Sequence, residues 1–285
     1  MAFGNFAVSA PSCCSRSKTH RPVHRESLPY KSTVDQRKIA ENFPLRFFMK
    51  EHPDLSTATG AGVHVALIDS GVNAQHSHVG FLAGGVAFLA AADGRVQQQE
   101  DYSDRIGHGT ALAGILRAKA PQVEIYAVKI FTDRLTASIA VLEAALTWAV
   151  QQRMHIINLS LGTTNPDHRA RLSEIVTRAN AVGTLLVASS PPGHLDVFPA
   201  ALPGVIGVAG DDQCAWTEHR YVADDPIPFR AHPCPRPLPG PAQARNFRGH
   251  SFASAHLSAL LALLVEKRPD FTVSDAQQYL RQTSQ

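Results

Sequence analysis

The chain has 285 residues, of which 44% are apolar and 18% are charged, so it is long enough for one large domain with a sizeable core. Its 27 basic residues exceed its 24 acidic residues by three, which is too small a surplus to indicate a nucleic-acid or membrane partner. The longest apolar stretch, residues 252–265, is shorter than the ~20 residues that a membrane-spanning helix needs.

Residues 1–44 differ in composition from the rest of the chain. Four basic residues come before the first acidic residue, Glu26, and no apolar period runs through the segment. We expect a basic, disordered extension, and an acid-poor organellar transit peptide is the alternative. Residues 1–15 lack the basic start and the unbroken apolar core of a secretory signal, so we expect a cytoplasmic protein.

Short apolar runs then alternate with helical patterns along the chain. The runs are rich in Val, Ile and Leu, as buried parallel strands are, and they span residues 63–68, 125–130, 156–160, 184–188 and 205–209. Helical patterns lie between and after them, at residues 110–117, 137–152, 167–181 and 252–266. This alternation predicts an α/β domain over residues 45–285, with a mostly parallel central sheet and helices on both of its faces.

One segment of the domain interrupts this alternation. Seven prolines lie between Pro226 and Pro241, and they argue against a regular helix or a central strand. We expect residues 226–241 to form an extended surface loop, with a proline-rich ligand motif as the alternative.

The four cysteines are Cys13, Cys14, Cys214 and Cys234. Their spacing fits neither a disulfide framework nor a paired zinc-binding motif. We expect unpaired thiols, as in a reducing compartment, and a Cys214–Cys234 bridge is the alternative.

Three polar residues stand at the junctions of these elements. Asp69 ends the first strand, His108 lies between two glycines just before a helix, and Ser251 lies where a loop enters a helix. Taken singly, they read as a helix-capping aspartate, a turn histidine and an N-cap serine. Together they have the chain order of one convergent serine triad. A serine hydroxyl is a weak nucleophile until an imidazole accepts its proton, and a carboxylate orients and stabilises that imidazole.

Four motifs then carry a resemblance to a known family. They are residues 65–72 around the aspartate, residues 108–114 from the histidine, residues 157–162 at the third predicted strand and residues 249–256 around the serine. In this order they resemble the subtilisin-like (subtilase) serine peptidases.

The resemblance implies a three-layer subtilisin-like α/β fold. It also implies an enzyme that hydrolyses peptide bonds through an acyl-enzyme. It implies Asp69 as the orienting residue, His108 as general base and acid, and Ser251 as nucleophile. The implied partner is a peptide or protein substrate, and we expect no cofactor and no metal. The position where many members carry a calcium-binding acid falls at about His78.

The sequence departs from the family at the oxyanion hole. The family places an asparagine side chain there, but the aligned position falls at about Pro192, and residues 185–193 contain no asparagine. The Ser251 amide remains as one donor, and Ser190 or His194 is our candidate for the second. His250 replaces the family's threonine before the nucleophile, and we expect it to be a solvent-facing turn residue.

The family pattern also implies where a substrate binds. We expect contacts from the segments that follow three predicted strands, namely Phe131, Thr132, Asp133, Ser160, Leu161, Gly162, Ala188 and Ser189. We expect slow, selective cleavage of a dedicated peptide or protein partner, such as leader-peptide removal or subunit maturation. The alternative is a pseudoprotease or peptide-binding scaffold. The sequence does not determine the oligomeric state.

Overall fold

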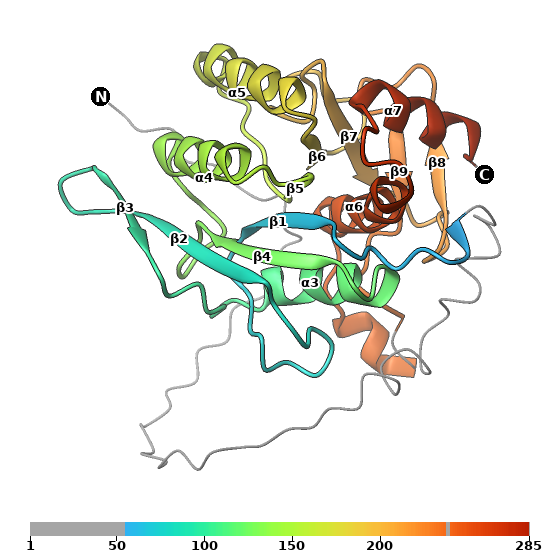
Figure 1. Cartoon of the computed structure of the whole chain (residues 1–285), viewed down its shortest axis with the longest axis horizontal. Coiled ribbons are helices and arrows are strands. Elements are labelled where there is room, and N and C mark those ends of the chain that lie inside the picture. The colour runs from blue at the N-terminus through green and yellow to red at the C-terminus, as the bar shows by residue number, and fades with distance from the viewer. Residues whose placement is uncertain (1–54, 238–239, 285) are drawn as a thin grey trace.

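The computed structural model describes residues 55–237 and 240–284, and the predicted basic extension lies outside them. In this part of the chain, nine strands form a single sheet in the order β3-β2-β4-β1-β5-β6-β7-β9-β8 (Figure 1). The strands are β1 (His64–Asp69), β2 (Gly84–Ala90), β3 (Val96–Gln99), β4 (Glu124–Lys129), β5 (Ile156–Leu159), β6 (Leu185–Ser189), β7 (Val205–Gly210), β8 (His219–Tyr221) and β9 (Phe229–Ala231). The helices are α3 (His108–Lys119), α4 (Ile139–Gln151), α5 (Arg169–Ala181), α6 (His250–Lys267) and α7 (Val273–Gln282), with 3₁₀ turns η2 (Pro166–His168) and η3 (Gly240–Arg245).

The five predicted strands are the centre of the sheet. They correspond to β4, β1, β5, β6 and β7, which are neighbours in that order and pair in parallel. Apart from a few residues at their ends, they are buried, as their unbroken apolar runs require. The predicted fold class, a mostly parallel α/β sheet covered on both faces, is therefore confirmed.

Helices cover the two faces of the sheet and enclose two cores. One core joins the sheet to α3, α6 and α7, and the other joins it to α4 and α5. Figure 1 shows α4 and α5 together on one side of the sheet, with α3 on the other. Every residue of α6 from Ser251 to Val265 is buried, because this helix packs against α3 and against several strands. Ser251 therefore lies in the first turn of an enclosed helix.

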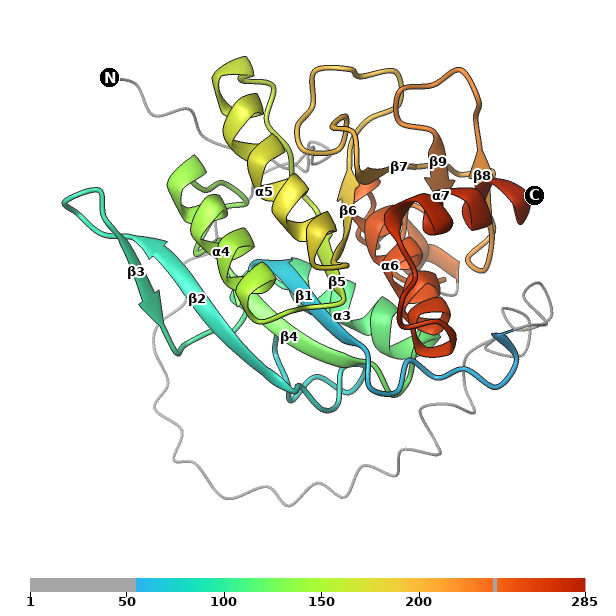
Figure 2. The same cartoon turned by 45° about the horizontal axis from the view of Figure 1, so that its top comes forward.

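Among the elements that the sequence did not predict are strands β2 and β3 and helix α7. Strands β2 and β3 form an antiparallel hairpin at one edge of the sheet (Figure 2). The sequence of β3 is largely glutamine, so its pairing with β2, rather than an apolar pattern, makes it a strand. Helix α7 begins with a capping box between Thr272 and Asp275 and buries Ala276 and Leu280, a signature too short to be noticed in the sequence.

The prediction of a surface loop over residues 226–241 was wrong for part of that segment. Strand β9 lies within it, buried and paired on both sides, with β7 in parallel and with β8 antiparallel. Its three residues contain no proline, so every amide needed for pairing is present, and Pro228 stands just before the strand. Counting prolines over sixteen positions concealed a short proline-free interval.

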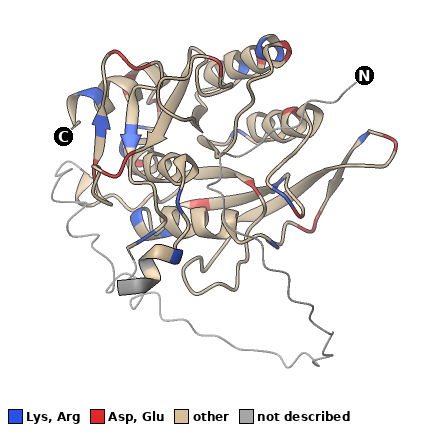
Figure 3. Cartoon of the chain, turned by 180° about the vertical axis from the view of Figure 1, so that it is seen from behind, with Lys and Arg blue, Asp and Glu red and all other residues tan. Residues whose placement is uncertain are grey.

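Charged residues of both signs are spread over the molecule. Lys, Arg, Asp and Glu are interspersed over the described part rather than segregated by sign (Figure 3). No described helix is long and apolar enough to cross a membrane. Cys214 and Cys234 are buried and Cys214 is a free thiol, whereas Cys13 and Cys14 lie outside the described residues.

Candidate active site

The structure brings Asp69, His108 and Ser251 into one hydrogen-bonded chain. The Nδ1 atom of His108 donates to Asp69 Oδ1 at 2.7 Å, and the Ser251 hydroxyl lies 3.0 Å from His108 Nε2. All three residues are nearly enclosed, with 0%, 4% and 3% of their surfaces exposed. With Nδ1 protonated, Nε2 is an acceptor, so this tautomer can remove the hydroxyl proton of Ser251.

The turn after β1 places Asp69 against the start of α3. The Ser70 amide donates to Asp69 Oδ1, and the Gly109 amide donates to Ser70 Oγ. Gly71 has φ +92°, and a Cβ there would lie 2.3 Å from the Tyr102 carbonyl oxygen. Glycine is therefore required for the tight turn that holds the carboxylate and the histidine helix together.

Asp104, which the sequence interpretation did not single out, organises the N-terminus of α3. Its Oδ1 accepts from the amides of Ile106 and Gly107, and its Oδ2 accepts from the amide and hydroxyl of Thr110. It thus binds several of the amides that a helix start leaves unpaired, immediately beside His108. The sequence signal that could have identified Asp104 is an acidic residue shortly before a glycine and the start of a helix.

The electrostatics of the site favour a charged imidazole. Burial, the strongest influence, lowers the pKa of His108, but the charge and hydrogen bond of Asp69 and the charge of Asp104 outweigh it. The net pKa of His108 is raised above its ordinary value of 6.5. The Oδ2 atom of Asp69 is buried without a hydrogen-bond partner among the described residues. The carboxylate therefore directs its charge mainly to His108.

A buried polar network holds Ser251 from below. Ser160 Oγ contacts the Ser251 carbonyl and Ser254 Oγ at 3.2 and 3.1 Å, and it accepts from Asn158 Nδ2. Ser258 on α6 donates to Asn158 Oδ1. Strand β5 is thereby joined to the first turns of α6, which fixes the height of the nucleophile above the sheet.

Several predicted substrate contacts are enclosed instead. Ser160, Ala188 and Phe131 have 0% exposed surface, and Leu161 has 2%. Ser160 supports Ser251 as described, whereas Phe131, Leu161 and Ala188 belong to the core beneath α4 and α5. Their contact with a substrate stays a prediction, and the sequence pattern cannot tell the last buried residue of a strand from the first exposed one.

The other predicted contact residues lie at the surface or close to it. Thr132 and Asp133 are exposed, Gly162 is partly exposed, and Ser189 is 7% exposed. A Cβ on Gly162 would lie 2.6 Å from Val197 Cγ1 and 3.3 Å from the Phe198 carbonyl oxygen. Glycine there lets residues 197–198 approach the end of β5 closely.

Both predicted second oxyanion donors make hydrogen bonds to their own neighbours in the chain. The Ser190 hydroxyl donates to the Pro191 carbonyl. His194 pairs with Asp196 through Nδ1 at 3.2 Å. Pro192, at the aligned family position, has no donor of its own. The assignment of Ser190 or His194 as donor stays a prediction.

His250 is held in one tautomer by a hydrogen bond from a backbone amide. Its Nδ1 accepts from the Gly210 amide at 3.0 Å, so a neutral ring carries its proton on Nε2. Burial, followed by the charges of Arg230 and His194, lowers the pKa of His250, which keeps the ring neutral at pH 7. The expectation of a solvent-facing turn histidine was wrong, because this ring is partly buried and hydrogen-bonded to the end of β7.

No cluster of three or more His, Cys, Asp or Glu side chains suited to a metal ion occurs in the described part of the chain. His78, where the family alignment suggested a lost calcium ligand, accepts a hydrogen bond from Arg236.

Comparison with known proteins agrees with this fold and geometry. The model of the subtilase family matches residues 60–218, and the chain belongs to that family. It is 31% identical over 79% of its length to a thermostable alkaline protease of Halalkalibacterium halodurans and, over the same share, to alkaline elastase YaB of Bacillus sp. strain YaB. It spans 63% and 60% of the lengths of these two relatives.

A third relative and a solved structure extend the comparison. Subtilisin Savinase of Lederbergia lenta is 29% identical over 79% of this chain and 84% of its own length. The crystal structure of a cold-adapted subtilisin-like serine proteinase superposes with a TM-score of 0.62, covering 79% of this chain and 83% of that one. At 19% identity, this last likeness concerns the fold alone.

Proposed function

We propose that the chain is a serine endopeptidase that cleaves peptide bonds through an acyl-enzyme. The observation that carries the proposal is the continuous hydrogen-bonded chain from Asp69 through His108 to Ser251. Ser251 Oγ attacks the peptide carbonyl carbon while its proton passes to His108 Nε2. The same proton then goes to the leaving amine, and a water deprotonated by His108 releases the acyl group.

The developing oxyanion needs donors, and we propose two adjacent ones. The first is the backbone amide of Ser251, at the start of α6. The second is the Nε2 proton of His250, which the hydrogen bond from Gly210 to Nδ1 keeps in place. Support for the second donor comes from the tautomer of His250 and from its position next to Ser251.

Active-site labelling tests the enzymatic proposal. A fluorophosphonate probe should form a covalent adduct on Ser251 of the full chain, and the Ser251→Ala variant should not react. A matched control is Ser173→Ala, which removes a serine of α5 outside the site. Absence of labelling under conditions that label an ordinary serine peptidase would favour the second candidate, a peptide-binding pseudoprotease. The observation that favours this candidate is the loss of the family's asparagine donor.

The narrower role that we propose is slow, selective processing of a dedicated partner, such as leader-peptide removal or subunit maturation. An altered oxyanion hole supports it, because a weaker donor lowers turnover without removing the triad. Incubation with the products of neighbouring genes, followed by mass spectrometry, should find one defined cut; general degradation would contradict the role. We also propose a cytoplasmic location, which the free thiol of Cys214 supports and cell fractionation would test.

A further inference from the structure

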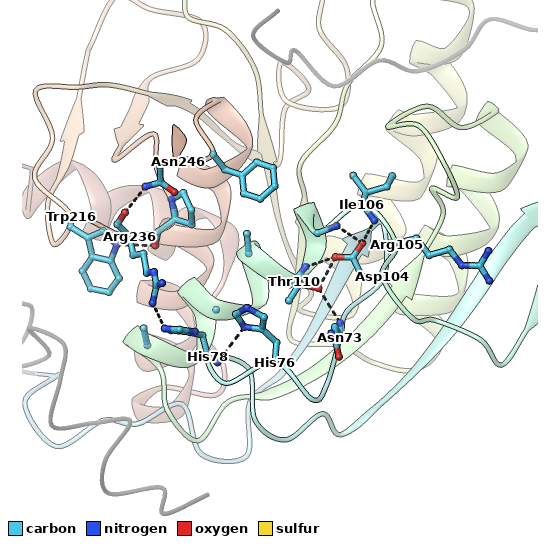
Figure 4. Close-up of a pocket in the computed structure, with 16 residues that line it drawn as sticks. Asn73, His76, His78, Asp104, Arg105, Ile106, Thr110, Trp216, Arg236 and Asn246 are labelled. Atoms are coloured by element: carbon cyan, nitrogen blue, oxygen red, sulfur yellow. Dashed lines mark hydrogen bonds between the residues drawn. The ribbon is translucent and has the colours of Figure 1, made fainter. Parts of the chain in front are cut away.

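A cavity of about 510 Å³ lies beside the triad, next to helix α3 (Figure 4). Three parts of the chain line it: the loop after β1, the first turns of α3 with the residues just before them, and the segment that follows β9. Trp216 adds an aromatic side chain. Loops from opposite ends of the sequence thus form one space against one side of α3.

The cavity is connected to the catalytic histidine. Gly107, which lines the cavity, immediately precedes His108, and Phe247 both lines it and meets the His108 ring edge-on, with centroids 6.4 Å apart. No lining residue comes from the ends of β5 or β6, where the acyl half of a substrate is expected. Since His108 gives its proton to the leaving amine, a cavity on its side is suited to the leaving half of the substrate.

The charge of the cavity is unbalanced. Asp104 is the one acid among its described lining residues, and its oxygens are already occupied by the start of α3. Arg236, which is partly buried, donates to His78 Nε2 and forms no ion pair with an acid in the described part of the chain. Figure 4 shows Arg236 and His78 pointing toward each other, with His76 next to them, whereas Arg105 extends away.

The walls around this cation are apolar. Trp216 is 6% exposed, Phe247 is 46% exposed, and Pro235 lies next to Arg236 in the chain. A guanidinium without an anionic partner among the described residues, in a cavity that Trp216 and Phe247 help to line, suits a carboxylate on an aliphatic stem. His76 and His78 can add hydrogen bonds and carry no negative charge that would compete with the ligand.

We propose that this cavity binds a carboxylate of the substrate on the leaving-group side of the scissile bond, with Arg236 as its cationic partner. The proposal rests on the proposed peptidase function and gives it a specificity. The carboxylate comes from a Glu or Asp side chain or from the C-terminus of the peptide.

Cleavage of a degenerate peptide library, read by mass spectrometry, tests the proposal. Acidic residues should be enriched in the first few positions after the cut bond, by about fivefold, the scale of one partly exposed charge pair. Arg236→Gln should abolish the enrichment, and the control Arg178→Gln on α5 should retain it. Libraries with a C-terminal acid or amide separate the two carboxylate sources. Cutting without enrichment, or enrichment that survives in Arg236→Gln, would overturn the proposal.

A binding measurement separates this proposal from the peptidase proposal. The chain has two tryptophans, so Ser251→Ala combined with Trp148→Phe leaves Trp216 as a fluorescent reporter in the cavity. Acetylated hexapeptide amides with a single Glu should bind about fivefold more tightly than the matched Gln peptides, and Arg236→Gln should remove the difference. Preferential binding without any cleavage by the parent chain would support the cavity and refute the peptidase. Equal binding of both peptides would refute the cavity.

Discussion

Gly109 lies so close to Gly71 that a Cβ on Gly109 would stand 2.1 Å from the Gly71 carbonyl oxygen. The same Cβ would be 3.3 Å from both Asp69 Cβ and Asp69 Oδ1. The helix that carries His108 can therefore reach the turn that carries Asp69 only because residue 109 has no side chain. The catalytic distance depends on this glycine as much as on the polar residues.

Gly109→Ala should separate α3 from the turn after β1 and lengthen the hydrogen bond between His108 Nδ1 and Asp69 Oδ1. We expect fluorophosphonate labelling of Ser251 to slow by about 100-fold, the cost of misplacing a catalytic group by ~1 Å. Gly114→Ala is the matched control, because a Cβ at that position of α3 meets its nearest atom at 3.7 Å. Equal rates in both variants would show that the close approach does not position the triad.

The labelling rate should also depend on the protonation of His108. Because the net pKa of His108 is raised above 6.5, the rate should fall as pH decreases through a midpoint above that value. The effect on stability has the opposite sense: the contribution of His108 is fully present below 6.5 and is lost as pH rises through the folded pKa. Labelling from pH 5 to 9 and thermal unfolding over the same range measure the two effects. A labelling midpoint below 6.5 would contradict this assignment.

Asp104→Asn should shift that labelling midpoint to lower pH, because the charge of Asp104 raises the pKa of His108. It should also lower the free energy of unfolding by about 1–2 kcal/mol, since the start of α3 loses acceptors for its amides. Asp101→Asn is the control: this exposed acid of the same loop bonds to Ser103 instead. If Asp104→Asn and Asp101→Asn have the same labelling midpoint, Asp104 does not tune His108.

His250→Asn should test the second oxyanion donor. The asparagine Oδ1 can still accept from the Gly210 amide, but the Nε2 proton is gone. We expect labelling and peptide cleavage to slow by about 10²–10³-fold, whereas Ser190→Ala and His194→Ala should each slow them by less than about tenfold. A large loss in either of those two variants, with His250→Asn near the parent rate, would return the role to the predicted residues.

The central strands and the triad were predictable because their signals are local. Buried parallel strands need unbroken apolar runs, and Asp69, His108 and Ser251 stand at the element junctions where α/β folds place site residues. Other features were not predictable, because they depend on neighbours distant in the chain. Strand β9 exists through pairing with β7 and β8, and Ser160 is enclosed because α6 packs over it.

The sequence by itself thus indicated the family, the order of the central strands along the chain and the three residues, Asp69, His108 and Ser251, that the structure joins by hydrogen bonds. Only the tertiary structure decided which ring nitrogen carries the hydrogen when a histidine is neutral, because the hydrogen-bond partner sets the tautomer. The partners are Asp69 for His108, Asp196 for His194 and the Gly210 amide for His250. It also decided that Arg236 and His78, 158 positions apart, share one cavity beside the triad. Sequence motifs show the chemistry of single segments. That Arg236 has no acidic partner among the described residues is visible only after the chain has folded.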